Sequence, residues 1–73
     1  MKRLGKQVQY YGIDIWITMP YVATDSDGTV CEYQEEPVMT TLGWDNALGH
    51  FSEICKVDLA GTNWEKTLAR FEV

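Results

Sequence analysis

A β-hairpin is predicted by residues 21–35, YVATDSDGTVCEYQE, and this stretch decides the fold. Its centre, Asp25-Ser26-Asp27-Gly28, is typical of a type I turn that ends in a glycine with positive φ. A three-residue loop over 26–28 then places Asp25 opposite Thr29 and fixes the register of the two strands. One face of the hairpin carries Tyr21, Ala23, Cys31 and Tyr33, and the other carries Val22, Thr24, Val30, Glu32, Gln34 and Glu36.

Residues 8–19 lie before the hairpin and are rich in β-branched and aromatic side chains, which favours extended structure. Ile13, Ile15 and Ile17 alternate onto one face. Val8 and Tyr10 have the opposite parity, so Gly12 is a candidate bulge or strand break. After the hairpin, residues 37–43 are expected to form a loop, 44–51 a short helical turn ending at Gly49, and 54–59 another strand of the sheet.

The C-terminal residues predict a helix. Thr62 and Glu65 fit a capping box, and Trp64, Leu68 and Phe71 recur at i, i+4 and i+7 over a helix from about 63 to 70. A final strand over 68–73 is the alternative. The expected fold is therefore a single α+β domain over residues 1–73, a small antiparallel sheet of about three to four strands with a C-terminal helix packed on one face.

The charge is acidic and unevenly distributed. The net charge is -5, and between Gln7 and Cys55 there are eight carboxylates and no Lys or Arg. This excludes the basic footprint of a nucleic-acid binder, so no direct nucleic-acid contact is expected. The N-terminal cations are followed by no signal-type apolar run, and the apolar stretch 15–19 is far shorter than a membrane span. A cytoplasmic protein with no membrane contact is expected.

Catalytic and metal-binding motifs are not found. The chain has two cysteines without a CxxC spacing and one histidine, His50. Residues 25–28 resemble the start of a calcium loop, but that alignment puts Ala23 at the first ligand position and Gln34 where a bidentate Glu is needed. We therefore expect no cofactor, no metal site, no structural disulfide and no enzymatic activity.

A partner-binding surface is predicted on the sheet. If the isoleucine face and the Tyr21 face both point toward the helix, Asp14, Trp16, Glu32 and Glu36 share the opposite side. A tryptophan surrounded by carboxylates is typical of an interface hot spot with an acidic rim. Two alternatives remain: Trp16 is covered by residues 37–52 as a second core layer, and the carboxylates form an ordinary solvated surface.

A resemblance to small proteins of tailed bacteriophages extends over about residues 21–68. It is carried by the stretch YVATDSDGTV at 21–30, by Tyr33, Pro37, Trp44 and Leu68, and by VDLAGTNW at 57–64. Cys31 departs from the pattern, where such sequences have an aromatic or aliphatic residue. The resemblance implies a phage product of the bacterial cytoplasm, a class in which many members bind and inhibit a host enzyme or an antiviral-defence complex.

The expected function is inhibition by binding. The acidic surface would engage a host or defence protein at a basic, nucleic-acid-handling surface, because complementary charge speeds association. The alternative is a structural or accessory phage protein that acts through self-association, as a homodimer for example. A small enzyme is the least favoured class.

Overall fold

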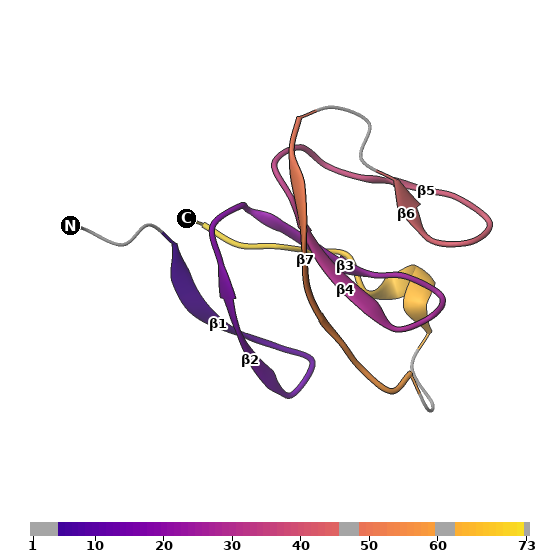
Figure 1. The fold of residues 1–73 in the computed structure, drawn as a ribbon, viewed down its shortest axis with the longest axis horizontal. Coiled ribbons are helices and arrows are strands. Elements are labelled where there is room, and N and C mark those ends of the chain that lie inside the picture. Colours follow the sequence, from indigo (N-terminus) through magenta and orange to yellow (C-terminus); the bar gives the residue numbers. More distant parts are fainter. Residues whose placement is uncertain (1–4, 46–48, 60–62, 73) are drawn as a thin grey trace.

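The computed structural model describes residues 5–45, 49–59 and 63–72, and in these ranges its regular secondary structure consists almost entirely of antiparallel strands (Figure 1). The only helical element among them is a three-residue 3-10 turn, η1, Trp64–Lys66. The strands are β1 (Lys6–Tyr10), β2 (Ile13–Ile17), β3 (Tyr21–Thr24), β4 (Thr29–Tyr33), β5 (Val38–Met39), β6 (Trp44–Asp45), β7 (Phe51–Lys56) and β8 (Ala69–Arg70).

The predicted hairpin is confirmed as β3 and β4, with Tyr21 opposite Tyr33 and Ala23 opposite Cys31. Its turn is closed by two backbone bonds of 2.9 Å, from Asp25 N–H to the Thr29 carbonyl and from Gly28 N–H to the Asp25 carbonyl. Gly28 has φ 92°, and a Cβ there would collide with the carbonyl oxygen of Val57. Both facts require glycine.

The main sheet has the strand order β7-β4-β3-β8, so β4 lies inside it and is buried along nearly its whole length. The predicted strand over 54–59 is present as β7, shifted toward the N-terminus. A register shift opposite Val30 and Cys31 leaves Ile54 without a partner, so β7 contains a bulge. Because Ile54 and Cys55 both pack toward the same core cluster, the bulge lets the edge strand present two consecutive apolar residues inward.

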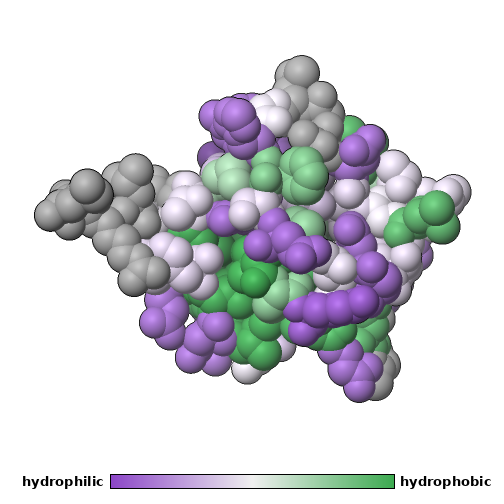
Figure 2. Space-filling model, in the orientation of Figure 1, coloured by the Kyte–Doolittle hydropathy of each residue, from purple (hydrophilic) through white to green (hydrophobic). Residues whose placement is uncertain are grey.

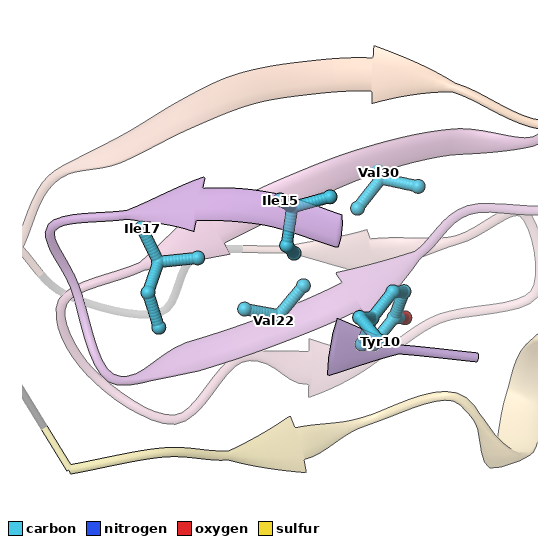
Figure 3. Close-up of a cluster of buried hydrophobic side chains, with 5 residues drawn as sticks. All are labelled: Tyr10, Ile15, Ile17, Val22 and Val30. Carbon is cyan, nitrogen blue, oxygen red and sulfur yellow. The ribbon is translucent and has the colours of Figure 1, made fainter. Parts of the chain in front are cut away.

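Strands β1 and β2 form a separate hairpin over the face that carries Val22 and Val30, here called the Val22 face. The parity change noted at Gly12 is a two-residue turn, with φ 47° at Tyr11 and φ 84° at Gly12, which are the signs of a type I′ turn. Tyr10 therefore pairs with Ile13, and Val8 with Ile15. Tyr10, Ile15 and Ile17 point from this hairpin toward Val22 and Val30 and form the larger core (Figure 3).

The other side of the sheet, here called the Tyr33 face, carries Ala23, Cys31 and Tyr33. Trp44 and Leu68 pack against these residues. Trp44 is held by its backbone N–H, which donates to the Asp25 carboxylate at 2.7 Å, and by its indole N–H, which donates to the Trp64 carbonyl at 3.3 Å. The β5–β6 pair and the segment around η1 thus cover this face.

The expected α+β class with a C-terminal helix is wrong. Leu68 packs on the Tyr33 face, whereas Ala69 and Phe71 pack with the larger core. This is the period of a strand, and the final strand that was the alternative is present as β8, paired with β3 through Tyr21 opposite Arg70 and Val22 opposite Ala69. Both faces of the sheet need apolar cover. A strand whose apolar side chains alternate between the two faces therefore buries more apolar surface here than a helix with one apolar side would.

The capping prediction is also corrected. Asn63, not Thr62, caps the 3-10 turn, and its side-chain oxygen accepts from Glu65 N–H at 3.1 Å; Thr62 lies outside the described residues. The predicted loop 37–43 contains β5, and the predicted helical turn begins instead as strand β6, with 46–48 outside the described residues. In the described ranges there is no helix long and apolar enough to cross a membrane.

The packing of the β1–β2 hairpin on the sheet can be tested at Ile17, which is fully buried. Ile17→Ala is expected to lower the free energy of unfolding by about 2–5 kcal/mol and Ile17→Val by about 0.5–1.5 kcal/mol, measured by urea denaturation. Gln9→Ala, on the exposed side of the same hairpin, is the control. Equal effects of Ile17→Ala and Gln9→Ala would show that the hairpin does not pack as described.

Candidate partner-binding surface

The four residues predicted to share one surface lie in three different places. Asp14 and Trp16 are on the side of the β1–β2 hairpin that faces away from the sheet. Glu32 is buried, and Glu36 is exposed in the connection after β4. The prediction placed the isoleucine face and the Tyr21 face on the same side, but the isoleucines pack on the Val22 face. This separates the four residues.

Glu32 is 6% exposed and lies opposite Val22, on the face that the hairpin covers. Its Oε1 atom accepts hydrogen bonds from the backbone N–H groups of Thr18 at 2.7 Å and Met19 at 3.0 Å. The Thr18 hydroxyl donates to the same oxygen at 3.4 Å. Carboxylate acceptors of this kind are stronger than neutral ones, so Glu32 fixes the connection between β2 and β3 and holds the two layers together.

Trp16 is 37% exposed and pairs with Gln7 across the hairpin, while Asp14 pairs with Gln9. The alternative that residues 37–52 cover Trp16 does not agree with the described part of that segment, because Trp44 packs on the Tyr33 face, on the far side of the sheet. Trp16 and Asp14 therefore form a small exposed area of their own.

A second exposed area was missed by the sequence reasoning. Of the six large hydrophobic side chains that are exposed among the described residues, four come from residues 38–51: Val38, Met39, Leu42 and Phe51. Phe51 stacks on Tyr33 with ring centroids 6.1 Å apart and planes at 22°. The Tyr33 hydroxyl donates to the Trp44 carbonyl at 3.4 Å, so β7 and β6 both contact the same buried ring.

Carboxylates accompany these apolar residues. Glu35, Glu36, Asp45 and Glu53 are all exposed. Burial is the main cause that raises the pKa of Tyr33, and the neighbouring Cys31, Asp25 and Asp45 raise it further. We use the name acidic–apolar surface for the exposed apolar and acidic residues of the stretch 35–53, which are Glu35, Glu36, Val38, Met39, Leu42, Asp45, Phe51 and Glu53.

Sequence could have pointed to this surface through one signal. Val38, Met39 and Leu42 are large apolar residues in a segment expected to be a loop, where they have little to pack against. The short β5–β6 pair holds them at the surface: Ser26 donates to the Leu42 carbonyl, and the Asp25 carboxylate accepts from Trp44. The anchoring partners come from the β3–β4 turn, which is distant in sequence.

Apolar surface is also visible between the β1–β2 hairpin and β7 (Figure 2). Ile13, Ile54, Cys55 and Val57 pack against the larger core there but are only partly buried. A two-stranded hairpin does not cover the whole Val22 face, so the core reaches solvent along this side.

The thiols do not form a reactive arrangement. Cys31 packs on the Tyr33 face and Cys55 with the larger core, and both are free. Burial, followed by the charges of Asp25 and Glu53, raises the pKa of Cys31 to about 11, which disfavours the thiolate. No three His, Cys, Asp or Glu side chains of the described residues are grouped to hold a metal ion.

Comparisons with known proteins give no further indication: no family model, no curated protein and no solved structure matches this chain.

Glu32 can be tested as a structural carboxylate. Glu32→Gln is expected to lower the free energy of unfolding by about 1–3 kcal/mol, because it replaces a charged acceptor of two backbone N–H groups in a partly buried site. Glu36→Gln, at an exposed position, is expected to stay within about 0.5 kcal/mol. Urea denaturation of both variants measures the difference, and similar stabilities would contradict the role assigned to Glu32.

The buried thiol gives a pH dependence. Because the pKa of Cys31 is raised from 9.0 to about 11 in the folded state, the unfolded chain loses this proton first. The contribution of the protonated Cys31 thiol to the free energy of unfolding is thus fully present below pH 9. As pH rises toward 11 this contribution is lost, and the free energy of unfolding falls by about 1–3 kcal/mol. Cys31→Ala should reduce this loss and the matched variant Cys55→Ala should retain it. Identical pH profiles for the two variants would be the contrary result.

Proposed function

We propose that this protein acts by binding a protein partner through its acidic–apolar surface, and that the partner presents a basic surface. The resemblance to small phage proteins supports a setting in the bacterial cytoplasm and an inhibitory role against a host or antiviral-defence protein. A surface that handles nucleic acid is the basic site that best fits the acidic charge of this chain.

The observation that carries this proposal is the exposure of Val38, Met39, Leu42 and Phe51 within a segment that has no Lys or Arg. Isolated apolar side chains at a surface are ordinary, but a group rimmed by polar residues is typical of a protein interface. Phe51 stacks on the buried Tyr33 ring, and Met39 pairs with Trp44, which packs against Tyr33, so these two exposed side chains are held in place before a partner binds. Such preorganisation lowers the entropic cost of association.

The carboxylates determine which partners fit. Glu35, Glu36, Asp45 and Glu53 would repel another acidic surface and attract a basic one. The same repulsion disfavours self-association through this surface, although exposed apolar groups alone would favour it. Sedimentation at rising protein concentration separates the two hypotheses, since a monomer is expected in the absence of partner.

The surface can be located with matched variants. Wild-type protein and the double variant Val38→Ser, Leu42→Ser are each used to capture partners from bacterial lysate, followed by mass spectrometry. Both changes are at exposed positions, so folding should be preserved, and the captured partner should be lost. Trp16→Ala, on the hairpin side away from the sheet, is the comparator and should retain the partner. The reverse pattern would assign binding to Trp16 and Asp14.

Kinetics with the identified partner test the charge. Glu35→Lys with Glu36→Lys should slow association, and the Val38, Leu42 double variant should speed dissociation. Binding should weaken as the salt concentration rises from about 0.05 to 0.5 M, because the Debye screening length becomes shorter over that range. Association that is unchanged by both salt and charge reversal would contradict a basic partner.

A further inference from the structure

The structure contains a cavity of about 340 Å³ at the end of the molecule where the β1–β2 turn meets the residues after β7. Tyr11, Ile13, Val57 and Leu59 provide aromatic and aliphatic walls. Tyr10, Thr24 and Thr67 provide hydroxyl groups, and Asp58 provides a carboxylate. The volume is at the lower end of the range for small-molecule sites. Phe51, in the acidic–apolar surface, begins β7, whereas this cavity adjoins its other end, so the two sites are separate.

One wall of the cavity is held by an unfavourable backbone conformation. Tyr11 has φ 47° and is the only residue other than glycine with a positive φ among the described residues. A bulky side chain is disfavoured there, and asparagine is the usual choice before glycine in such a turn. Tyr11 is nevertheless fixed, because its hydroxyl donates to the Lys66 carbonyl at 2.9 Å and its ring lies at 88° to the Tyr10 ring, with the two centroids 4.8 Å apart. Strain of this kind is concentrated at functional sites.

The hydroxyl protons around the cavity are already used within the protein. Tyr10 donates to the Thr67 carbonyl at 3.0 Å, which leaves the Thr24 hydroxyl to donate to the Tyr10 oxygen at 2.8 Å. Thr67 donates to the Trp64 carbonyl at 2.7 Å, and Tyr11 donates to Lys66. The Thr67 oxygen also accepts from the Thr24 backbone N–H at 2.9 Å, and Tyr10, Thr24 and Thr67 are each at most 3% exposed. The accessible hydroxyl is that of Tyr11, which is 62% exposed, and its remaining capacity is as an acceptor through its oxygen lone pairs.

We propose that this cavity binds a small organic cation with a flat apolar body, such as an aromatic amidine or amine. The body would lie between the Tyr11 ring and the aliphatic wall, and a positive group over a tyrosine ring gains cation–π attraction. Its N–H groups would donate to the exposed Tyr11 hydroxyl oxygen, and Asp58 adds negative charge to the lining. This proposal does not depend on the protein-binding surface, and each can fail without the other.

The test uses three compounds of nearly equal shape and different charge: benzamidine, benzamide and benzoate. Each is titrated to about 20 mM into the full-length ¹⁵N-labelled protein, and amide shifts are followed by NMR. Benzamidine should move the amides of Thr24, Val57 and Thr67 with a dissociation constant on the order of 1 mM. Benzamide should bind more weakly, and benzoate should leave these amides unchanged.

Two variants link the binding to the cavity. Tyr11→Asn creates the favoured Asn-Gly turn, so the protein should keep its thermal midpoint while its affinity for benzamidine falls about fivefold or more. Asp58→Asn should weaken benzamidine about two- to fivefold. The control is Glu72→Gln. Glu72 follows Phe71, whose backbone N–H donates to the Pro20 carbonyl between β2 and β3, away from the β1–β2 turn that lines the cavity. This variant should bind benzamidine normally.

Three results would overturn the proposal. These are the absence of shifts at the cavity amides, equal binding of benzoate or benzamide and benzamidine, and full benzamidine affinity in Tyr11→Asn. A benzamidine response that maps only to residues 34–53 would also overturn it, since it would show general attraction of cations to the acidic–apolar surface.

Discussion

The burial of β4 on both faces is the constraint on which the rest of the structure depends. Its residues alternate between the two sides, so that Val30 enters one core while Cys31 and Tyr33 enter the other. A chain of 73 residues has too little material for two full layers over such a sheet. It covers one face with the β1–β2 hairpin and the other with the β5–β6 pair and the segment around Leu68. Each cover is small and leaves part of the core half-exposed.

The small elements that cover each face of the sheet are held by hydrogen bonds to two carboxylates from the Lys- and Arg-free segment between Gln7 and Cys55. Glu32 accepts from the backbone at Thr18 and Met19 and ties down the β2–β3 connection. Asp25 accepts from Trp44 on the opposite side of the sheet. Both accept from backbone N–H groups in partly buried sites, where leaving such a donor unpaired is costly. The excess of acidic residues is therefore partly structural, and only the remaining carboxylates are available to a partner.

Incomplete cover also creates the two candidate sites. On the Tyr33 face, the β5–β6 pair is too short to bury Val38, Met39 and Leu42, which stay exposed beside carboxylates. On the Val22 face, a cavity remains between the β1–β2 turn and the residues after β7. Both sites occur where a two-stranded element ends above the main sheet, which is how a small β fold can present concave or apolar surface without a separate loop domain.

The sequence by itself determined the β3–β4 hairpin, because the turn residues 25–28 and the alternation of apolar residues on both sides are local and agree with each other. It also determined the parity change at Gly12 and the strand character of 54–56, the part of the predicted strand 54–59 that β7 contains. Only the tertiary structure decided the C-terminal segment: Trp64, Leu68 and Phe71 fit a helical period, but the open edge of β3 and two uncovered faces favour a strand that places Leu68 and Phe71 on opposite sides. It likewise decided which face the isoleucines cover. That choice buries Glu32 and exposes Trp16 elsewhere. No local sequence pattern predicts it, because both faces of the β3–β4 hairpin are apolar enough to be covered.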